Sequence, residues 1–199
     1  MKRIAFFISG TGGNALNLFK VCGEGGIDAL AVMAISSSAK AIGVERLRAV
    51  GLRVEVVIRS SFNSDDEYSR ECFSRCEADA VDIICLCGFL KKLVIPDQWM
   101  ERVLNIHPGP LPQFGGSGMY GHFVHEAVLS AGVSESGPTI HLVDNQYDHG
   151  KILAFEPVPV FTGDTPATLQ KRVYEAEMRL YPIVLRNFIS SLSAKGNQR

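Results

Sequence analysis

The sequence predicts an α/β fold, a single domain whose mainly parallel twisted sheet is flanked by helices. Short continuous apolar runs alternate with helical segments through the first half of the chain. Such runs are typical of strands that helices cover on both faces. A glycine-rich turn follows the first run, and a long helical segment closes the chain. With 199 residues, the chain can bury a substantial core within one domain.

In the first half, strands and helices are expected to alternate. The expected strands are Ile4–Ile8, Ala29–Ile35, Val54–Ile58, Asp82–Leu86 and Val103–His107. The expected helices are Asn14–Cys22, Lys40–Val50 and Asp65–Cys76. Gly23 and Gly51 follow the first two helices, and glycine commonly ends a helix. Because strands and helices alternate, we expect these strands to run parallel to one another.

The second half of the chain has a different character. It contains the glycine-rich loop Phe114–Gly121, followed by an expected helix at His122–Ala131. Thr139–Val143 and Ile152–Val160 are expected to be strands. The link between them, Asp144–Lys151, is short enough for the two strands to lie antiparallel.

The chain is expected to end in a long helix. Thr165 as N-cap and Pro166 at the first helical position open this helix, which should run to about Leu192. The tail Ser193–Arg199 is expected to fray, as chain termini with few contacts do. No internal repeat, low-complexity segment or linker divides the sequence, which supports a single domain.

Composition and charge exclude several classes of function. The formal net charge is −1 and the pI is near 6.5, so nothing favours binding to nucleic acid or to an anionic membrane. No apolar run approaches the roughly 20 residues of a membrane span. The five cysteines include no Cys-x-x-Cys pair and indicate buried thiols in a reducing compartment, without structural zinc. We therefore expect a soluble, cytoplasmic protein.

The segment Asn105-Ile106-His107-Pro108 is the most informative part of the sequence. It ends a predicted strand, in which alternate side chains share a face, so Asn105 and His107 should point the same way. Pro108 then ends the strand pairing. A carboxamide donor beside a group that titrates near neutrality suits stabilisation of an oxyanion with proton transfer next to it. A strand-end histidine is more often structural, so this interpretation depends on residues elsewhere in the chain.

The segment Ser9-Gly10-Thr11-Gly12-Gly13-Asn14 joins the first expected strand to the first expected helix. Its glycines let backbone N–H groups approach an anion, and the amino end of a helix adds a favourable dipole. A phosphate site and a plain tight turn are the two interpretations, and the position after the first strand favours the phosphate site. Gly10-x-Gly12-x-x-Ala15 also fits a relaxed dinucleotide fingerprint, but the second strand does not end in the acidic residue that would hold a ribose. A single phosphate monoester is therefore favoured.

The remaining polar residues support more than one interpretation. Asp148, between the two late strands, is either a turn residue or a carboxylate that orients and charges the strand-end histidine. His122 and His125 have helical i,i+3 spacing, which is weak evidence for a metal without matching carboxylates. His141 alternates along a strand and is expected to be structural. Ser117 lacks the full Gly-x-Ser-x-Gly pattern, which disfavours a serine hydrolase.

Together these segments resemble the glycinamide ribonucleotide formyltransferase family, folate-dependent enzymes of purine synthesis. The resemblance spans nearly the whole chain. Its matching segments are Ile8–Asn14, Leu86–Leu90, Leu104–Pro108, Leu111-Pro112, Gly137–His141, Asp148–Gly150 and Glu177. Asn-Ile-His-Pro followed by a downstream aspartate is quite specific to enzymes that handle folate formyl groups. The resemblance implies the Rossmann-like fold of this family.

The resemblance also implies roles for individual residues. Asn105, His107 and Asp148 match the catalytic trio of the family. The substrate-binding positions are matched by Gly12, Gly13 and Asn14 for the phosphate, Glu177 for the ribose, and Leu90, Lys91, Lys92, Leu93, Val143 and Asp144 for the folate. Leu111-Pro112 matches a peptide bond that is cis in the family. No metal is implied.

The activity implied is transfer of the formyl group of 10-formyltetrahydrofolate to the amine of glycinamide ribonucleotide, in de novo purine biosynthesis. The amine attacks directly. Asn105 and protonated His107 stabilise the tetrahedral oxyanion, while Asp148 keeps His107 charged and, through water, helps to remove the proton of the amine. The products are formylglycinamide ribonucleotide and tetrahydrofolate.

The resemblance further implies that the two halves of the chain have different binding roles. Residues 1–100 would form the half that binds the ribotide phosphate, and 101–192 the catalytic and folate-binding half, with 193–199 as the frayed tail. The partners would be the small-molecule substrates, with no nucleic acid and no membrane, and a homodimer is compatible with the sequence.

Two alternatives remain open at this point. One is a related enzyme that hydrolyses the formyl donor or formylates a different amine, and the other is a nucleotide-binding module without catalysis. Some positions also depart from the family pattern. Gly109-Pro110 replaces a more usual Ser-Leu pair, His149 stands where a small residue is common, and Asp65 stands where some members have a basic residue. These departures bear on affinity more than on reaction type.

Overall fold

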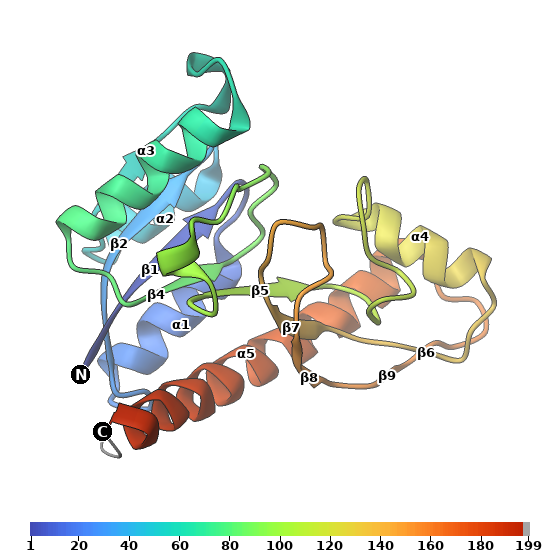
Figure 1. The fold of residues 1–199 in the computed structure, drawn as a ribbon. Coiled ribbons are helices and arrows are strands. Elements are labelled where there is room, and N and C mark those ends of the chain that lie inside the picture. The colour runs from blue at the N-terminus through green and yellow to red at the C-terminus, as the bar shows by residue number, and fades with distance from the viewer. Residues whose placement is uncertain (197–199) are drawn as a thin grey trace.

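The computed structural model describes residues 1–196, and side chains as far as Leu192, around a central seven-stranded sheet (Figure 1). In spatial order the strands are β3 (Val54–Val56), β2 (Ala29–Ser36), β1 (Lys2–Ile8), β4 (Ile83–Leu86), β5 (Val103–His107), β7 (Thr139–Leu142) and β8 (Ile152–Phe155). The first five are parallel, whereas β7 pairs antiparallel with both β5 and β8. The expected mainly parallel sheet with antiparallel late strands is confirmed, and the order β3-β2-β1-β4-β5 is that of a mononucleotide-binding fold.

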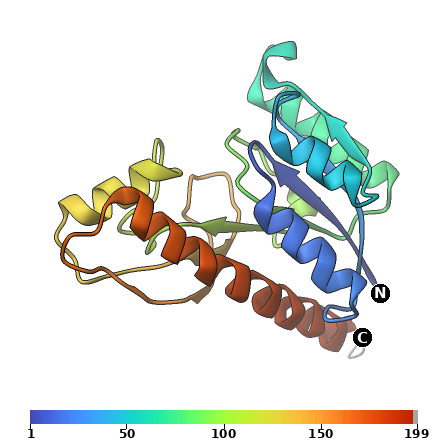
Figure 2. The same cartoon turned by 180° about the vertical axis from the view of Figure 1, so that it is seen from behind.

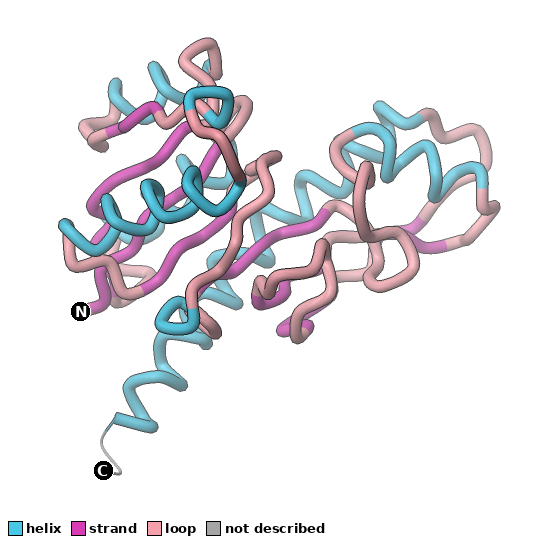
Figure 3. Tube along the Cα trace, turned by 45° about the horizontal axis from the view of Figure 1, so that its top comes forward, coloured by secondary structure: helices cyan, strands magenta, loops and turns pink. Residues whose placement is uncertain are grey.

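Helices cover both faces of this sheet. These helices are α1 (Gly13–Gly23), α2 (Ile42–Ala49), α3 (Asp65–Ala78) and α5 (Pro166–Gly196), while α4 (His122–Ser130) packs against α5. Phe6 of β1 points to the face where α1, α2 and α5 build one core, and its neighbour Phe7 points to the opposite core, which contains α3. This is the alternation expected of a strand that is buried on both sides. Figure 2 shows α1 and α5 side by side, and Figure 3 shows the strands lying between helices.

The helix starts follow local sequence signals. Gly12, the residue before α1, has φ of 68°, a left-handed conformation that glycine adopts without steric cost. Ser64 precedes α3, and its side chain accepts a hydrogen bond from the backbone N–H of Glu67 at 3.1 Å. This cap satisfies one of the free N–H groups of the first turn. Two 3-10 turns, Arg59–Ser61 and Asp97–Trp99, complete the helical structure.

One expected strand is wrong in its extent. Ile152–Val160 is divided into β8 and a short strand β9 (Val158–Pro159). β9 pairs with β6 (Glu135–Ser136), which the sequence analysis did not anticipate, in a separate two-stranded sheet. The division falls at Pro157, because proline has no N–H group to continue a strand ladder.

The last helix is longer than expected. α5 begins at Pro166, as predicted, but continues past Leu192 to Gly196. The last three residues of the expected frayed tail, 197–199, lie outside the described part of the chain. Near its amino end α5 packs with α4 around a smaller core that includes Val128 and Val173. Among the residues described, no helix is both long enough and apolar enough to cross a membrane.

Tyr181 ties α5 to the centre of the sheet. Its side chain is fully buried, and its hydroxyl lies 3.2 Å from the carbonyl oxygens of both Leu86 in β4 and Leu104 in β5. Burial raises the pKa of this hydroxyl, so it stays protonated and serves both carbonyls as a donor. A buried hydroxyl group stabilises the folded state when it is paired in this way.

We therefore predict that Tyr181→Phe lowers the free energy of unfolding by about 1–2 kcal/mol, because both carbonyls lose a donor while the ring still fills its space. Urea denaturation followed by circular dichroism measures this difference. Tyr120→Phe is the matched control, since Tyr120 is exposed and its hydroxyl has no hydrogen bond in the described structure. Equal losses in the two variants would contradict the assignment.

Candidate active site

A cavity of about 600 Å³ lies at the carboxyl ends of the central strands. The loop after β1 supplies Gly12 to its wall, and the end of β5 supplies His107. Both residues lie at the ends of strands that were expected to be parallel, and the carboxyl ends of parallel strands meet at one edge of a sheet. The structure therefore confirms that the glycine loop and the Asn-Ile-His-Pro segment border one cleft.

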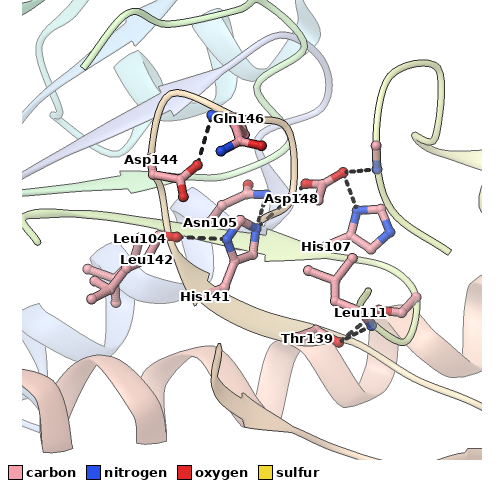
Figure 4. Close-up of polar contacts among 12 residues, drawn as sticks. Leu104, Asn105, His107, Leu111, Thr139, His141, Leu142, Asp144, Gln146 and Asp148 are labelled. Carbon is pink, nitrogen blue, oxygen red and sulfur yellow. Dashed lines mark hydrogen bonds and ion pairs between the residues drawn. The ribbon is translucent and has the colours of Figure 1, made fainter. Parts of the chain in front are cut away.

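Strand pairing brings Asn105 and His107 together with two residues of β7. β5 and β7 are antiparallel, with Asn105 opposite His141 and His107 opposite Thr139. Side chains that face each other across such a pair lie on the same face of the sheet. The Thr139 hydroxyl donates to the Gly109 carbonyl at 2.8 Å and accepts from the backbone N–H of Leu111 at 3.3 Å (Figure 4), which fixes the chain just beyond β5.

His107 is buried, and both of its ring nitrogens face oxygen atoms. Nε2 lies 2.8 Å from the carbonyl oxygen of Phe114, which can only accept, so Nε2 carries a hydrogen. Nδ1 lies 3.5 Å from Oδ2 of Asp148. Burial lowers the pKa of His107, and the Asp148 charge and the Phe114 carbonyl only partly oppose this effect. The ring is therefore mainly neutral at pH 7, with Nδ1 able to take up a proton beside the carboxylate.

Asp148 lies between two histidines (Figure 4). Its Oδ1 is 3.6 Å from Nε2 of His141, and its Oδ2 accepts a hydrogen bond of 3.0 Å from the backbone N–H of Gly116. Burial alone would raise the pKa of Asp148. The His141 ring, the proximity of His107 and the Gly116 N–H together hold that pKa below its usual value. Asp148 is thus a carboxylate at neutral pH, and its φ of 50° is a left-handed conformation that is uncommon outside glycine.

His141 orients Asn105. Its Nδ1 lies 2.9 Å from the Leu142 carbonyl oxygen and therefore carries a hydrogen. Nε2 lies 3.0 Å from the Asn105 amide nitrogen, from which it accepts when it carries no hydrogen, and 3.6 Å from Oδ1 of Asp148, towards which a hydrogen on Nε2 would point. One amide hydrogen of Asn105 is used in this way, and the second remains available to a bound oxygen. The sequence predicted a structural role for His141. In the structure His141 contacts two of the three expected catalytic residues, so it belongs to the candidate site as well.

The glycine-rich loop Phe114–Gly121 contacts the site through its backbone. The Phe114 carbonyl accepts from His107, and the Gly116 N–H donates to Asp148. A Cβ atom on Gly115 would lie 2.9 Å from the Asp148 Cβ, so a side chain there would displace the aspartate. Glycine at this position permits a close approach of the loop to Asp148.

The start of α1 builds the end of the cavity where the sequence predicts a phosphate site. Gly12 and Gly13 both line the cavity, at the position where the first N–H groups of a helix have no intrahelical partner. The side chain of Asn14 points towards α5, where its amide donates to Oε2 of Glu177 at 2.7 Å. The sequence-predicted residues of the phosphate and ribose ends therefore lie together, with Asn14 contacting Glu177 directly.

Glu177 is a buried carboxyl group on the wall of the cavity. Burial raises its pKa to about 7, although the hydrogen bond from Asn14 favours the charged form. The carboxyl group is therefore divided between its protonated and ionised forms near neutral pH. In either form its oxygens can accept hydrogen bonds from hydroxyl groups.

A smaller cavity of about 90 Å³ is lined in part by Asn105 and Asp148. It is lined by five of the residues that the sequence assigned to folate: Lys91, Lys92, Leu93, Val143 and Asp144. Leu90, the sixth, lines the larger cavity instead. The turn that carries Asp144 is braced by His149, whose Nδ1 lies 2.8 Å from Oδ2 of Asp144. His149 therefore pairs with Asp144 and not with the neighbouring Asp148.

The other departures from the family pattern also have structural explanations. A Cβ atom on Gly109 would lie 2.5 Å from Cγ1 of Val124, so glycine leaves room for α4 to pack beside the site. Asp65 pairs with Arg59 at the start of α3, away from both cavities. The Leu111-Pro112 peptide bond is cis, as the resemblance implied.

Sequence reasoning missed several residues of the cavity wall. Lys171 and Tyr174 line it together with Glu177, and their three-residue spacing on a predicted helix was the signal that could have identified them. His125 also lines it and is buried, with Nδ1 unpartnered and its pKa lowered to about 4 by burial and by the nearby histidines. Within residues 1–196, no group of three or more His, Cys, Asp or Glu side chains could hold a metal ion.

The raised pKa of Glu177 predicts a pH-dependent stability. A carboxyl group whose pKa is higher in the folded than in the unfolded chain stabilises the fold fully at low pH, and this contribution is lost as the pH rises through the folded pKa. We expect Glu177→Gln to weaken the fall in unfolding free energy between pH 5 and pH 8, by on the order of 3 kcal/mol. Urea denaturation across this range tests it. Glu175→Gln, at an exposed position of the same helix, should leave the dependence unchanged.

Comparisons with known proteins agree with this geometry. The formyl transferase family model matches residues 2–185. A chloroplastic phosphoribosylglycinamide formyltransferase of Arabidopsis thaliana is 38% identical over 183 residues, which is 90% of this chain and 63% of that protein. The phosphoribosylglycinamide formyltransferase of Escherichia coli is 32% identical, covering 93% of this chain and 86% of that protein.

Solved structures show the same fold. Glycinamide ribonucleotide transformylase 1 from Symbiobacterium toebii superposes with a TM-score of 0.90 at 33% identity, over 96% of this chain and 89% of that one. The chain spans less than two thirds of the Arabidopsis protein, and less than a fifth of the human trifunctional purine biosynthetic protein that it also matches. The match over residues 2–185 establishes that the chain belongs to the formyl transferase family.

Proposed function

We propose that this protein transfers the formyl group of 10-formyltetrahydrofolate to the amine of glycinamide ribonucleotide. One observation carries the proposal: a single cavity joins the glycine loop, Glu177 and the groups around His107. A ribosyl phosphate that carries a reactive amine needs an anion site, a hydroxyl acceptor and an acid–base group in that arrangement. The names of the relatives support the same substrate.

The ribotide would lie with its phosphate at the start of α1 and its ribose beside Glu177. The backbone N–H groups of Gly12, Gly13 and Asn14 would receive the phosphate, aided by the helix dipole. Glu177 would accept hydrogen bonds from the ribose hydroxyls, held in place by Asn14. This assigns the phosphate largely to the first half of the chain and the ribose to α5.

The folate would occupy the smaller cavity between Leu93 and Val143. Apolar side chains there suit the flat face of a pterin, and Asp144 with the backbone of residues 144–148 offers polar groups for its edge. Lys91 and Lys92 would lie near the acidic tail of the cosubstrate. The residues present therefore fit a folate, which would supply the formyl group when bound.

Catalysis would rest on Asn105, His107 and Asp148. When an amine adds to the formyl carbon, the formyl oxygen gains negative charge. The free amide hydrogen of Asn105 and a proton at Nδ1 of His107 would stabilise that charge. The amine loses one proton and the departing nitrogen gains one, so His107 and Asp148 would pass a proton without any net change in the protein.

The low pKa of His107 refines the mechanism expected from the sequence. In the free protein the ring is mainly neutral, because burial outweighs the influence of Asp148. A neighbouring oxyanion would raise that pKa, so protonation of His107 would accompany the reaction and not precede it. A group that charges only as the transition state forms stabilises the transition state more than the bound substrate.

The direct test is a formyl-transfer assay with glycinamide ribonucleotide and 10-formyltetrahydrofolate. We expect formylated ribotide and tetrahydrofolate to appear in equal amounts. A parallel reaction without ribotide should release formate only at the background rate. Rapid formate release without the acceptor would instead identify a hydrolase, and turnover with other amines alone would identify a different formyl acceptor.

The catalytic trio is tested by substitution. Asp148→Asn keeps an acceptor for Gly116 but removes the charge beside His107, so kcat should fall by about 10²–10⁴ while both substrates still bind. Asn105→Ala removes an oxyanion donor and should lower kcat by about 10²–10³. Because these groups act on one transition state, Asp148→Asn/His107→Ala should be little worse than the poorer single variant.

Steady-state kinetics and substrate titrations measure these effects. Asp97→Asn, at an exposed position that lines neither cavity, provides the control for removal of a surface charge. Fully additive losses in kcat, or normal turnover in Asp148→Asn, would show that Asp148 is only a turn residue.

A further inference from the structure

Gly12 and Gly13 are glycines for different reasons. Gly12 has φ of 68°, which favours glycine whatever surrounds it. Gly13 lies outside the left-handed region, so its backbone would accept any L-residue. What excludes a side chain at Gly13 is Tyr174: a Cβ atom there would overlap the tyrosine hydroxyl oxygen and lie 3.0 Å from Cζ of the ring. The Tyr174 hydroxyl therefore stands where a side chain of residue 13 would stand.

This hydroxyl is free to bind a ligand. Tyr174 is 41% exposed, lines the cavity and has no hydrogen bond in the described structure. By contrast, Tyr181, two turns further along the same helix, is fully buried, and its hydroxyl lies within hydrogen-bond distance of two carbonyl oxygens. Lys171 and Glu177 lie three residues before and after Tyr174, so the three side chains follow one face of α5 along the cavity.

We propose that the Tyr174 hydroxyl donates a hydrogen bond to the phosphate of the substrate and thereby sets the preference for a phosphorylated substrate. The inference rests on the proposed function, which places the phosphate at the start of α1. An anion bound to the N–H groups of the first turn lies against Gly13, next to the hydroxyl. The phosphate site thus takes a donor from α5 that a Ser or Thr at position 13 would otherwise supply, and Lys171 adds a positive charge one turn away.

The first test compares the protein with Tyr174→Phe, which keeps the ring between α5 and Gly13 and removes only the oxygen. Loss of a hydrogen bond to a charged group should weaken binding of inorganic phosphate by about tenfold in isothermal titration. In the formyl-transfer assay the loss should fall on KM for glycinamide ribonucleotide and not on kcat. With glycinamide riboside, which lacks the phosphate, the two proteins should have equal kcat/KM. Glu175→Gln, at an exposed position of α5 that lines neither cavity, should bind phosphate normally.

A second test moves the hydroxyl. Gly13→Ser alone should weaken phosphate binding, because its side chain collides with Tyr174. Gly13→Ser/Tyr174→Ala should bind phosphate more tightly than Tyr174→Ala, because the serine hydroxyl then fills the vacated position. Thermal unfolding of each variant separates these effects from loss of the fold.

Three results would overturn the proposal: no phosphate binding by the unmodified protein, equal phosphate affinity in Tyr174→Phe, or equal losses with the phosphorylated and unphosphorylated substrates. The titration involves no formyl transfer. A loss of phosphate affinity in a protein that does not formylate the ribotide would therefore overturn the proposed function and leave the role of Tyr174 intact.

Discussion

The site depends on two strand pairings of β5, one parallel and one antiparallel. Because β5 is parallel to β4, its carboxyl end lies at the same edge as the loop after β1. Because it is antiparallel to β7, Asn105 faces His141 directly across the strand pair. Only the strand where the sheet changes direction can contribute to both arrangements. A shift of one residue in the β5–β7 register would turn the facing side chains of one strand to the other side of the sheet.

The long helix α5 joins the two parts of the cavity. Through Tyr181 it is fixed to β4 and β5, and through Val173 it packs in the small core with α4. Glu177 lies between these anchors, with Asn14 of α1 as its partner. Rigid anchors on both sides explain how a buried carboxyl group with a raised pKa is held at a cavity wall. Its burial would otherwise favour a rearrangement that exposes it to water.

Much of the fold and part of the site could be predicted from sequence, because the signals involved are local. The apolar runs, the glycine loop and the Asn-Ile-His-Pro segment each lie within a few residues, and their positions after strands place them at one edge. The division at Pro157, the pairing of β6 with β9 and the orientation of Asn105 by His141 depend on contacts between distant segments. A single sequence gives no register for such contacts. The contact between Tyr174 and Gly13, which are 161 positions apart in the sequence, could not be predicted for the same reason.

The glycine-rich loop contacts His107 and Asp148 with main-chain atoms, and this affects which genetic changes it can tolerate. The Phe114 carbonyl and the Gly116 N–H exist whichever side chains the loop carries. Point substitutions at its exposed positions, such as Ser117, leave both contacts available. Insertion or deletion of a single residue between Pro112 and Gly116 would move the carbonyl away from His107 and the N–H away from Asp148 at once. At the exposed positions of this loop, length is thus under tighter constraint than side-chain identity, whereas Gly115 is fixed by its close approach to Asp148.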